Sequence, residues 1–308
     1  MNYCKIIWFC LLSFCCTSLF AQTTINFEEN LIAKYLGKQL YTFSDTRGRK
    51  SFNEIRALES LFELSKGDVI DFGVSNNNNW VKFDVYNNSE NDKIILNLGY
   101  PPIDEVEFYV IRHDNVYSYR VDKKTEIENR HYNHQFFLFD ILIKKGESAT
   151  CYLKLKSNKQ LIAPITFNTQ KTLIQETTNT DVFSGLYLGT MVVMILYNLF
   201  IYFSGKDKQY LLYVNYIFWV ALAQACLLGY VQRFLYDSNI WLNENLLTLA
   251  GAMSGVGTIL FVKDFLNTKN LAPRLNKILN LILIGDLLAI VLLFFGFALV
   301  CYQVVNLI

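Results

Sequence analysis

Four long apolar segments in the second half of the chain restrict its fold more than any other feature. They span about 182–203, 210–230, 244–262 and 278–300, with polar loops between them. Each has roughly the 20 residues that an α-helix needs to cross the hydrocarbon core of a bilayer. We therefore predict an α-helical transmembrane bundle with four spans over residues 182–308, preceded by a polar, soluble domain.

Positive charge in the loops predicts the orientation of these helices. The first and third loops carry six basic residues: Lys206, Lys208, Lys263, Lys269, Arg274 and Lys277. The second loop carries only Arg233. Cytoplasmic loops of membrane proteins are enriched in lysine and arginine, so the first and third loops are expected in the cytoplasm and the residues before 182 outside it. The lipid bilayer is then the first expected partner, and the expected location is the inner (cytoplasmic) membrane, crossed several times.

The N-terminus gives the same orientation by an independent route. Residues 1–21 combine the basic Lys5, an apolar core and a small-residue cleavage site that ends at Ala21, which is the pattern of a secretory signal peptide. The alternative is an uncleaved anchor helix. Lipidation at Cys15 or Cys16 is not expected, because the bulky Phe14 lies where lipidation signals need a small residue.

Cysteine usage indicates how the exported domain is held together. Outside the signal peptide, Cys226 and Cys301 lie in predicted membrane helices, and only Cys151 remains for the exported domain. A single cysteine cannot form an intradomain disulfide, so the domain must rest on a hydrophobic core.

Residues 22–167 are predicted to form a β-sandwich with a helical segment at its N-terminus. Apolar residues have helical spacing over 25–43 and 52–64. From residue 69 the period changes to two, with eight short strand candidates between turn signals: 69–74, 80–86, 94–98, 106–111, 116–120, 136–143, 150–156 and 162–167. This pattern is typical of two packed sheets, and we expect a jelly-roll-like fold. Residues 168–181 are polar and strand-poor, and we expect a linker there.

The exported domain contains no recognisable catalytic, cofactor or metal constellation. His131 and His134 are three residues apart, but their loop context favours solvated or capping roles over a metal site. Asp104, Glu105 and Glu107 fit a charged rim better than a general acid and base. No glycine-rich phosphate loop follows a strand, and no serine stands at a nucleophile elbow. We therefore predict that this chain is not an enzyme and uses no cofactor.

Tyrosines are the best ligand-binding candidates of this domain. An exposed tyrosine can stack on a sugar ring or contact a peptide, although aromatic residues in strands more often pack in the core or across strands. The five candidates are Tyr100, Tyr109, Tyr117, Tyr119 and Tyr132. Trp80 opens the strand at 80–86 and is predicted to be a structural anchor.

Asp286 is an acid deep in the predicted fourth span. Such an acid costs roughly 2.5–3.5 kcal/mol on insertion scales, and each surrounding Leu, Ile, Phe or Val returns about 0.3–0.6 kcal/mol, so insertion is expected to survive. We expect Asp286 to face neighbouring helices and to accept a hydrogen bond from Asn198, Asn215 or Gln224. The same four residues would form the polar track of a transporter, an alternative that is less favoured because scattered amides commonly serve helix packing.

Several short segments, in a fixed order from about Val69 to the end, match a known pattern. They are Phe72-Gly-Val-Ser75, Trp80-Val-Lys-Phe-Asp-Val-Tyr-Asn87, Leu98-Gly-Tyr-Pro-Pro-Ile-Asp-Glu-Val-Glu-Phe-Tyr109, Arg130, Cys151-Tyr-Leu-Lys-Leu-Lys-Ser157, Gly185-Leu-Tyr-Leu-Gly189, Tyr197-Asn198 and the segment from Asp207 to Asn215. With these segments the chain resembles the bacterial seven-transmembrane receptors with diverse intracellular signalling modules.

The resemblance implies a jelly-roll sensor domain of the second extracellular type, similar to carbohydrate-binding modules, followed by seven helices. It also implies a cytoplasmic output such as a histidine kinase or diguanylate cyclase. This sequence ends after its fourth apolar segment, which departs from that plan. We therefore expect either a truncated product of a longer gene or a chain that needs a signalling partner protein.

These observations lead to one main prediction of function and one alternative from another class. We predict a membrane receptor or sensor whose exported domain binds an extracellular or periplasmic ligand, a carbohydrate or another small molecule, and transmits binding through the membrane helices. The alternative is an accessory envelope scaffold whose sandwich binds another protein. A formal net charge of +1 argues against a nucleic-acid partner, which would need a basic stripe.

Overall fold

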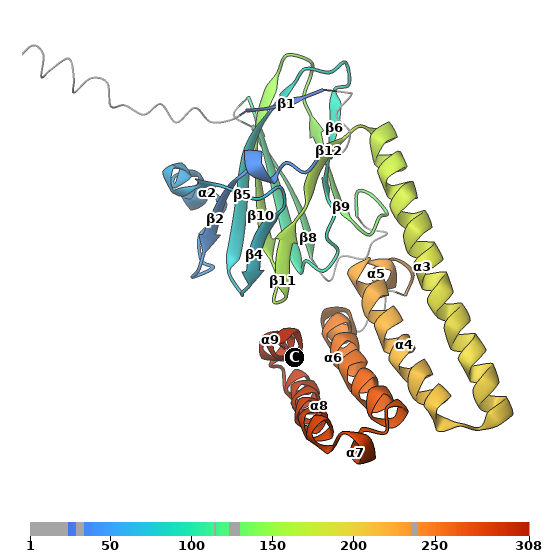
Figure 1. Cartoon of the computed structure of the whole chain (residues 1–308). Helices are drawn as coiled ribbons and strands as arrows, with labels where there is room; N and C mark the ends of the chain where they lie inside the picture. Colours follow the sequence, from blue (N-terminus) through green and yellow to red (C-terminus); the bar gives the residue numbers. More distant parts are fainter. Residues whose placement is uncertain (1–23, 29–33, 114, 123–129, 236–239, 308) are drawn as a thin grey trace, which may run out of the picture.

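A strand-rich part is followed along the chain by a bundle of long helices (Figure 1). The computed structural model describes residues 24–28, 34–113, 115–122, 130–235 and 240–307. The strands lie between Thr24 and Asn168, together with the short helix α2 (Phe52–Arg56), and the helices of the bundle extend from Gln170 to Leu307. The predicted fold class, a β-sandwich followed by an α-helical bundle, is confirmed. The predicted signal peptide at 1–21 lies outside the described residues.

Two groups of strands face each other in the sandwich. The larger sheet has the order β3-β2-β5-β10-β7-β8, with β1 beside β5. Its strands are β1 (Thr24–Phe27), β2 (Tyr41–Asp45), β3 (Glu63–Leu64), β5 (Asn78–Asn87), β7 (Glu105–Arg112), β8 (Asn115–Asp122) and β10 (Ser148–Lys156). The other group is the sheet β12-β6-β9 and the pair β11-β4. Its strands are β4 (Ile70–Val74), β6 (Lys93–Leu98), β9 (Phe137–Leu142), β11 (Gln160–Ala163) and β12 (Ile165–Asn168).

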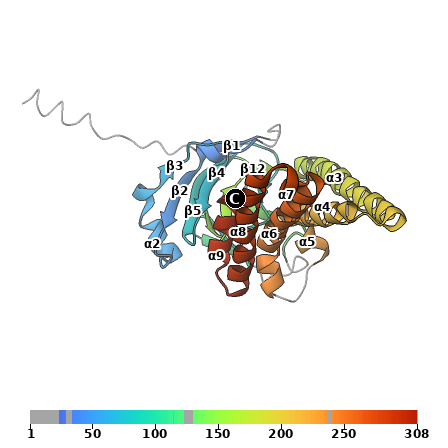
Figure 2. The same cartoon turned by 60° about the horizontal axis from the view of Figure 1, so that its bottom comes forward.

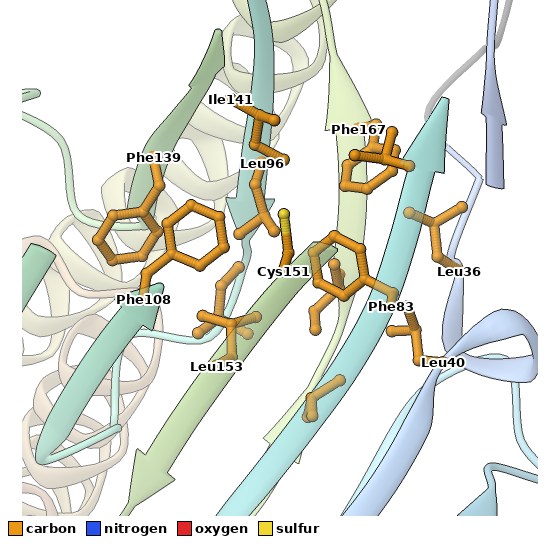
Figure 3. Close-up of a cluster of buried hydrophobic side chains, with 14 of the residues drawn as sticks. Leu36, Leu40, Phe83, Leu96, Phe108, Phe139, Ile141, Cys151, Leu153 and Phe167 are labelled. Carbon is orange, nitrogen blue, oxygen red and sulfur yellow. The ribbon is translucent and has the colours of Figure 1, made fainter. Parts of the chain in front are cut away.

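One hydrophobic cluster fills the space between these sheets (Figure 3). Alternate residues of β5 and β10 point into it, such as Phe83, Cys151 and Leu153, and meet Leu96 and Phe139 from the opposing sheet. Burying one such large side chain stabilises the fold by about 1.5–3 kcal/mol. Cys151 is a free, buried thiol, so this core and not a disulfide holds the domain together.

The predicted helical segment at 25–43 is wrong. Thr24–Phe27 and Tyr41–Asp45 are strands, and between them, among the described residues 34–40, Gly37–Gln39 forms the 3₁₀ turn η1. The two strands pair with β5. Strand pairing and core burial override a helical spacing of apolar residues that is too short to fix secondary structure.

The second predicted helical stretch, 52–64, is only partly helical. It contains α2 (Phe52–Arg56) and the 3₁₀ turn η2 (Glu59–Leu61), and then joins β3. Ser51 caps α2 in a capping box, in which its hydroxyl accepts from the backbone N–H of Glu54.

The last predicted strand, 162–167, is two strands in the structure. Pro164 separates β11 from β12. Proline has no backbone N–H to donate to a sheet, so the ladder breaks there. β11 then pairs with β4 and β12 with β6, on different sheets.

Four helices are long and apolar enough to cross a membrane within the described part of the chain. They are α3 (Gln170–Gly205), α4 (Lys208–Leu227), α6 (Ile240–Phe265) and α8 (Pro273–Phe294). Short helices connect or extend them: α5 (Tyr230–Phe234), α7 (Thr268–Leu271) and α9 (Ala298–Leu307). α3 packs on α4, α4 on α6, and α6 on α8, so α3 lies on one flank of the bundle (Figure 2).

Two helix boundaries differ from the sequence prediction. The segment 168–181, expected to be a linker, is mostly the first part of α3, which begins at Gln170 after a capping box at Thr169. The fourth long helix ends at Phe294 because Gly296 takes a left-handed conformation with φ of 88°, after which α9 begins.

Candidate functional site

A small pocket lies at the edge of the sandwich between β8 and β9. Both are edge strands of their sheets, so side chains from the two layers meet around this space. Its volume is about 180 Å³. The lining residues are Tyr119, Arg120 and Val121 of β8, Phe137, Leu138 and Phe139 of β9, and Arg130, His131, Tyr132 and Phe136 of the preceding segment.

Aromatic rings form the floor of this pocket. The ring of Phe139 lies 5.1 Å from that of Phe108 and 6.3 Å from that of Tyr119, between centroids. The guanidinium of Arg130 lies 4.9 Å from the centre of the Phe137 ring. Such cation–π contacts are worth about 0.5–1 kcal/mol at exposed sites and more when dry. The pocket therefore combines flat apolar surfaces with a positively charged group.

Asp140 organises the polar side of the same region. Its carboxylate accepts from the Tyr132 hydroxyl at 2.5 Å and lies 2.9 Å from both the Lys93 ammonium and His131 Nε2. Burial opposes ionisation of Asp140, but hydrogen bonds from Tyr132, Lys93 and His131 outweigh it and hold its pKa below the usual value. The carboxylate thus fixes the positions of Tyr132 and His131 at the pocket.

The segment that precedes β9 also contacts the membrane helices. Gln135 Nε2 donates to Asp181 Oδ1 of α3 at 3.1 Å, and Arg233 Nη1 of α5 donates to Gln135 Oε1 at 2.7 Å. The Tyr230 hydroxyl donates to Asp181 Oδ1 at 2.8 Å, and Arg233 lies 3.6 Å from the other oxygen of that carboxylate. We call Gln135, Asp181, Tyr230 and Arg233 the junction, because they join the sandwich to two helices.

Gly229 brings the membrane part into direct contact with the sandwich beside the junction. It has φ of 78°, and a Cβ there would lie 2.8 Å from side-chain atoms of Gln135 and Pro101. His134 lies in the same segment, and its Nδ1 accepts from the N–H of Phe136 at 3.0 Å. Burial and the nearby guanidinium lower the pKa of His134 to about 4, so the ring is neutral near neutral pH.

The start of α3 is anchored on the sandwich as well. Leu173 packs against Ile95 of β6 and Leu138 of β9. One turn further on, Glu176 accepts from Asn168 Nδ2 at 3.1 Å. Leu138 also lines the pocket. The pocket, β9 and α3 therefore share one packing unit.

Two of the five predicted tyrosines, Tyr119 and Tyr132, line the pocket, and the structure places the other three elsewhere. The Tyr100 hydroxyl donates to the carbonyl of Gln160 at 3.1 Å. Tyr117 is exposed beyond the pocket.

Tyr109 belongs to a separate aromatic cluster on the outer face of the large sheet. Its ring stacks on Phe52 of α2 at 4.0 Å, and Trp80 and Tyr152 belong to the same cluster. Trp80 is 1% exposed, and its indole Nε1 has no hydrogen-bond partner among the described residues. α2 thus covers this face with Phe52.

The charged candidates form ion pairs. Asp104 lies 3.3 Å from the Lys159 ammonium, and Glu107 lies 3.1 Å from that of Lys154. Glu105 pairs with Arg120 at 2.9 Å. In the part of the chain that the structure describes, no group of three His, Cys, Asp or Glu residues could hold a metal ion.

Asp286 of α8 is buried against α6, where Gly255 leaves room for it. Its Oδ2 has no hydrogen-bond partner among the described residues. The expected amide partners make other contacts: Asn198 Nδ2 donates to the carbonyl of Met194, and Asn215 Oδ1 accepts from Trp219. The structure does not bring these amides to Asp286.

Family comparison decides the identity of both parts of the chain. Residues 37–169 match the model of the 7TMR-DISM extracellular 2 domain, and residues 180–308 match the 7TM diverse intracellular signalling domain. The chain belongs to this receptor family. No curated protein matches the chain.

Membership of this family gives the orientation of the sandwich and the helices relative to the membrane. The receptor is a multi-pass membrane protein with its sandwich outside the cytoplasm, and the matched domains are sensory rather than catalytic. The end of α3 at Gly205, α7 and the connection between α3 and α4 lie at the end of the bundle remote from the sandwich, which is the cytoplasmic side (Figure 1).

Sequence reasoning missed the junction of this receptor. Gln135 is separated from Asp181 by 46 positions and from Arg233 by 98, and no local pattern links them. Arg130 was singled out only through the family resemblance. Arg233 carried one usable signal, because it is the lone basic residue of a loop on the outer side.

Proposed function

We propose that this receptor binds a small extracellular or periplasmic ligand in the pocket between β8 and β9 and passes the binding event to its membrane helices through the junction. The observation that carries the proposal is the dual position of segment 130–137. Arg130 and Tyr132 line the pocket, whereas Gln135, three residues after Tyr132, bonds to α3 and α5.

The lining residues suggest the chemical class of the ligand. Arg130 brings a guanidinium to the pocket, a group that suits a carboxylate or another anion, while the neighbouring Arg120 is paired with Glu105 at 2.9 Å. Tyr119 and Tyr132 offer ring faces. The volume of about 180 Å³ is below the roughly 300 Å³ at which drug-sized sites begin. We therefore propose a ligand the size of one sugar ring that carries an acidic group, such as a uronic acid.

Ligand binding in this site can act on the helices with little motion. β9 and α3 share packing through Leu138 and Leu173, so a shift of segment 130–137 displaces both the junction and the start of α3. We propose that the receptor lies in the inner (cytoplasmic) membrane and that a cytoplasmic signalling module, in the same polypeptide or in a partner protein, carries out the output reaction.

Calorimetry on the full chain in lipid nanodiscs tests this proposal. Glucuronate and galacturonate are titrated, with glucose as the neutral counterpart. We expect the acids to bind and glucose to bind at least tenfold more weakly. Tyr119→Leu, which keeps an apolar side chain but removes the ring, is expected to weaken binding, and Tyr117→Leu on the same strand outside the pocket is the matched control.

Two outcomes would contradict the assignment. Equal binding of glucose and the acids would show that the pocket does not recognise an acidic group. Equal loss in the Tyr119 and Tyr117 variants, with unchanged melting temperatures, would place the ligand elsewhere on the sandwich.

A further inference from the structure

A second pocket is lined by residues of α4, α6, α7 and α8 and of the connection before α7. In Figure 1, α6, α7 and α8 meet at the cytoplasmic end of the bundle. Its volume is about 510 Å³. Its polar lining includes Lys263, Lys269, Asn276 and Asn280, and Leu212 and Leu260 contribute apolar walls. Nothing in the proposed sensing mechanism uses this pocket.

Positive charge dominates the surroundings of this pocket. Segments 206–208 and 263–277 carry six basic residues against two acidic ones, a formal net charge of +4. The acid that lines the pocket, Asp264, is neutralised by the Lys208 ammonium at 2.6 Å. Lys263 bonds to the neutral amide of Asn280, so its charge is not compensated there. Lys269 is exposed and forms no ion pair with another described residue.

The amide side chains of the pocket present donors. Asn276 Oδ1 accepts from the Thr268 hydroxyl at 3.1 Å, and Asn280 Oδ1 accepts from the Lys263 ammonium. With both amide oxygens used, the NH₂ groups remain, and neither donates to another group in the described part of the chain. Ammonium and amide N–H groups together form a donor set for an anion with several acceptor oxygens, such as a phosphate group.

Two exposed leucines next to pocket residues along the chain distinguish a lipid from a free ion. Leu266 directly precedes the pocket residue Asn267, and Leu271 ends α7, which contains the pocket residue Lys269. These leucines are 49% and 77% exposed. A dissolved phosphate ion gains nothing from exposed leucines. A phospholipid buries its acyl chains against them while its headgroup stays among the polar residues.

We propose that this pocket binds the phosphate headgroup of an anionic phospholipid from the cytoplasmic leaflet. Lys263, Lys269 and the amides of Asn276 and Asn280 contact the phosphate, and the acyl chains lie along Leu266 and Leu271. Basic residues near an anionic membrane surface are attracted to it in general, wherever they lie. A defined site adds directional hydrogen bonds to this general attraction.

Native mass spectrometry of the full chain in neutral detergent tests the proposal. Phosphatidylglycerol is titrated against phosphatidylcholine, and inorganic phosphate is added in a parallel series. We expect phosphatidylglycerol to bind more tightly than phosphatidylcholine and millimolar phosphate to leave it bound. Lys269→Gln should weaken phosphatidylglycerol binding about tenfold, which corresponds to the loss of ~1.4 kcal/mol, close to the lower end for a hydrogen bond to a charged group. Lys277→Gln removes the same charge from a residue outside the pocket lining and should change binding less than twofold.

Three results would overturn the proposal. Equal affinity for the two lipids would show that the headgroup charge is not recognised. Displacement of phosphatidylglycerol by millimolar phosphate would assign the pocket to a free ion. Equal weakening by the two lysine variants would mean diffuse surface attraction instead of a site. Circular dichroism and the melting temperature without added lipid verify that each variant is folded.

Discussion

Gly229→Ala offers the sharpest test of contact between the membrane helices and the sandwich. Gly229 has φ of 78°, and an L-residue in that region costs about 1–2 kcal/mol. The new Cβ would also lie 2.8 Å from side-chain atoms of Gln135 and Pro101. These are Cβ and ring atoms close to the backbone and not flexible ends, and overpacking of this kind costs about 1–3 kcal/mol more.

Gly296→Ala is the matched control. Gly296 also has positive φ, 88°, but a Cβ there would meet nothing within 4 Å. It therefore shares the backbone cost and lacks the clash. The difference between the two variants isolates the contact with the sandwich, about 1–3 kcal/mol.

Hydrogen exchange of the full chain in nanodiscs measures this difference. The amides of His134 and Phe136 donate to Tyr132 and to the His134 ring, beside the junction. Because 1.4 kcal/mol is a factor of ten, Gly229→Ala should speed their exchange roughly 5- to 150-fold relative to Gly296→Ala. Equal exchange in both variants would refute the idea that the helices constrain segment 130–137.

Four further predictions follow from individual residues. Trp80→Ala should lower the free energy of unfolding by roughly 3–5 kcal/mol in urea titrations, and Trp80→Phe should cost much less, because it removes a buried indole donor that has no acceptor among the described residues. His134 has a pKa of about 4 in the folded state and 6.5 in the unfolded chain, so the unfolded state binds more protons between these pH values and stability falls as pH drops from 6.5 to 4. His134→Gln should flatten the dependence of the melting temperature on pH in this range. An unchanged slope would assign the acid sensitivity to other groups. Asp286→Ala should leave or raise thermal stability in detergent, since its Oδ2 has no partner in the described chain, whereas a clear loss would reveal an unrecognised contact. Reporter fusions after Lys208 and after Lys277 should give the cytoplasmic signal, and alkaline phosphatase activity at either site would contradict the orientation.

The strand pattern of the sandwich was clearest where only one face of a strand is buried. In β7, Val106, Phe108 and Val110 are buried and alternate with less buried residues, which is a direct consequence of the two-layer core. The four apolar helices were equally evident, because bilayer thickness requires a length that soluble helices rarely combine with such composition.

The errors lie where long-range contacts decide local structure. β1 and β2 were assigned to a helix because their pairing with β5 leaves no trace in short-range spacing. The polar start of α3 was taken for a linker, yet Leu173 docks on the sandwich and the helix continues through it. Part of the pocket lining could be predicted from the sequence. Tyr119 and Tyr132 could be proposed from residue type, but only the arrangement of β8 and β9 separates them from the other three tyrosines.

The uninterrupted α3 fixes an angular relation between sensor and membrane. A helix turns about 100° per residue, so one residue inserted between 170 and 181 would swing every lipid-facing side chain of α3 by that angle relative to the sandwich. Seven inserted residues would restore the same azimuth to within roughly 20°. Length changes in this stretch among related receptors should therefore come close to whole helical turns. Other lengths would rotate the lipid-facing surface of α3 relative to the sandwich.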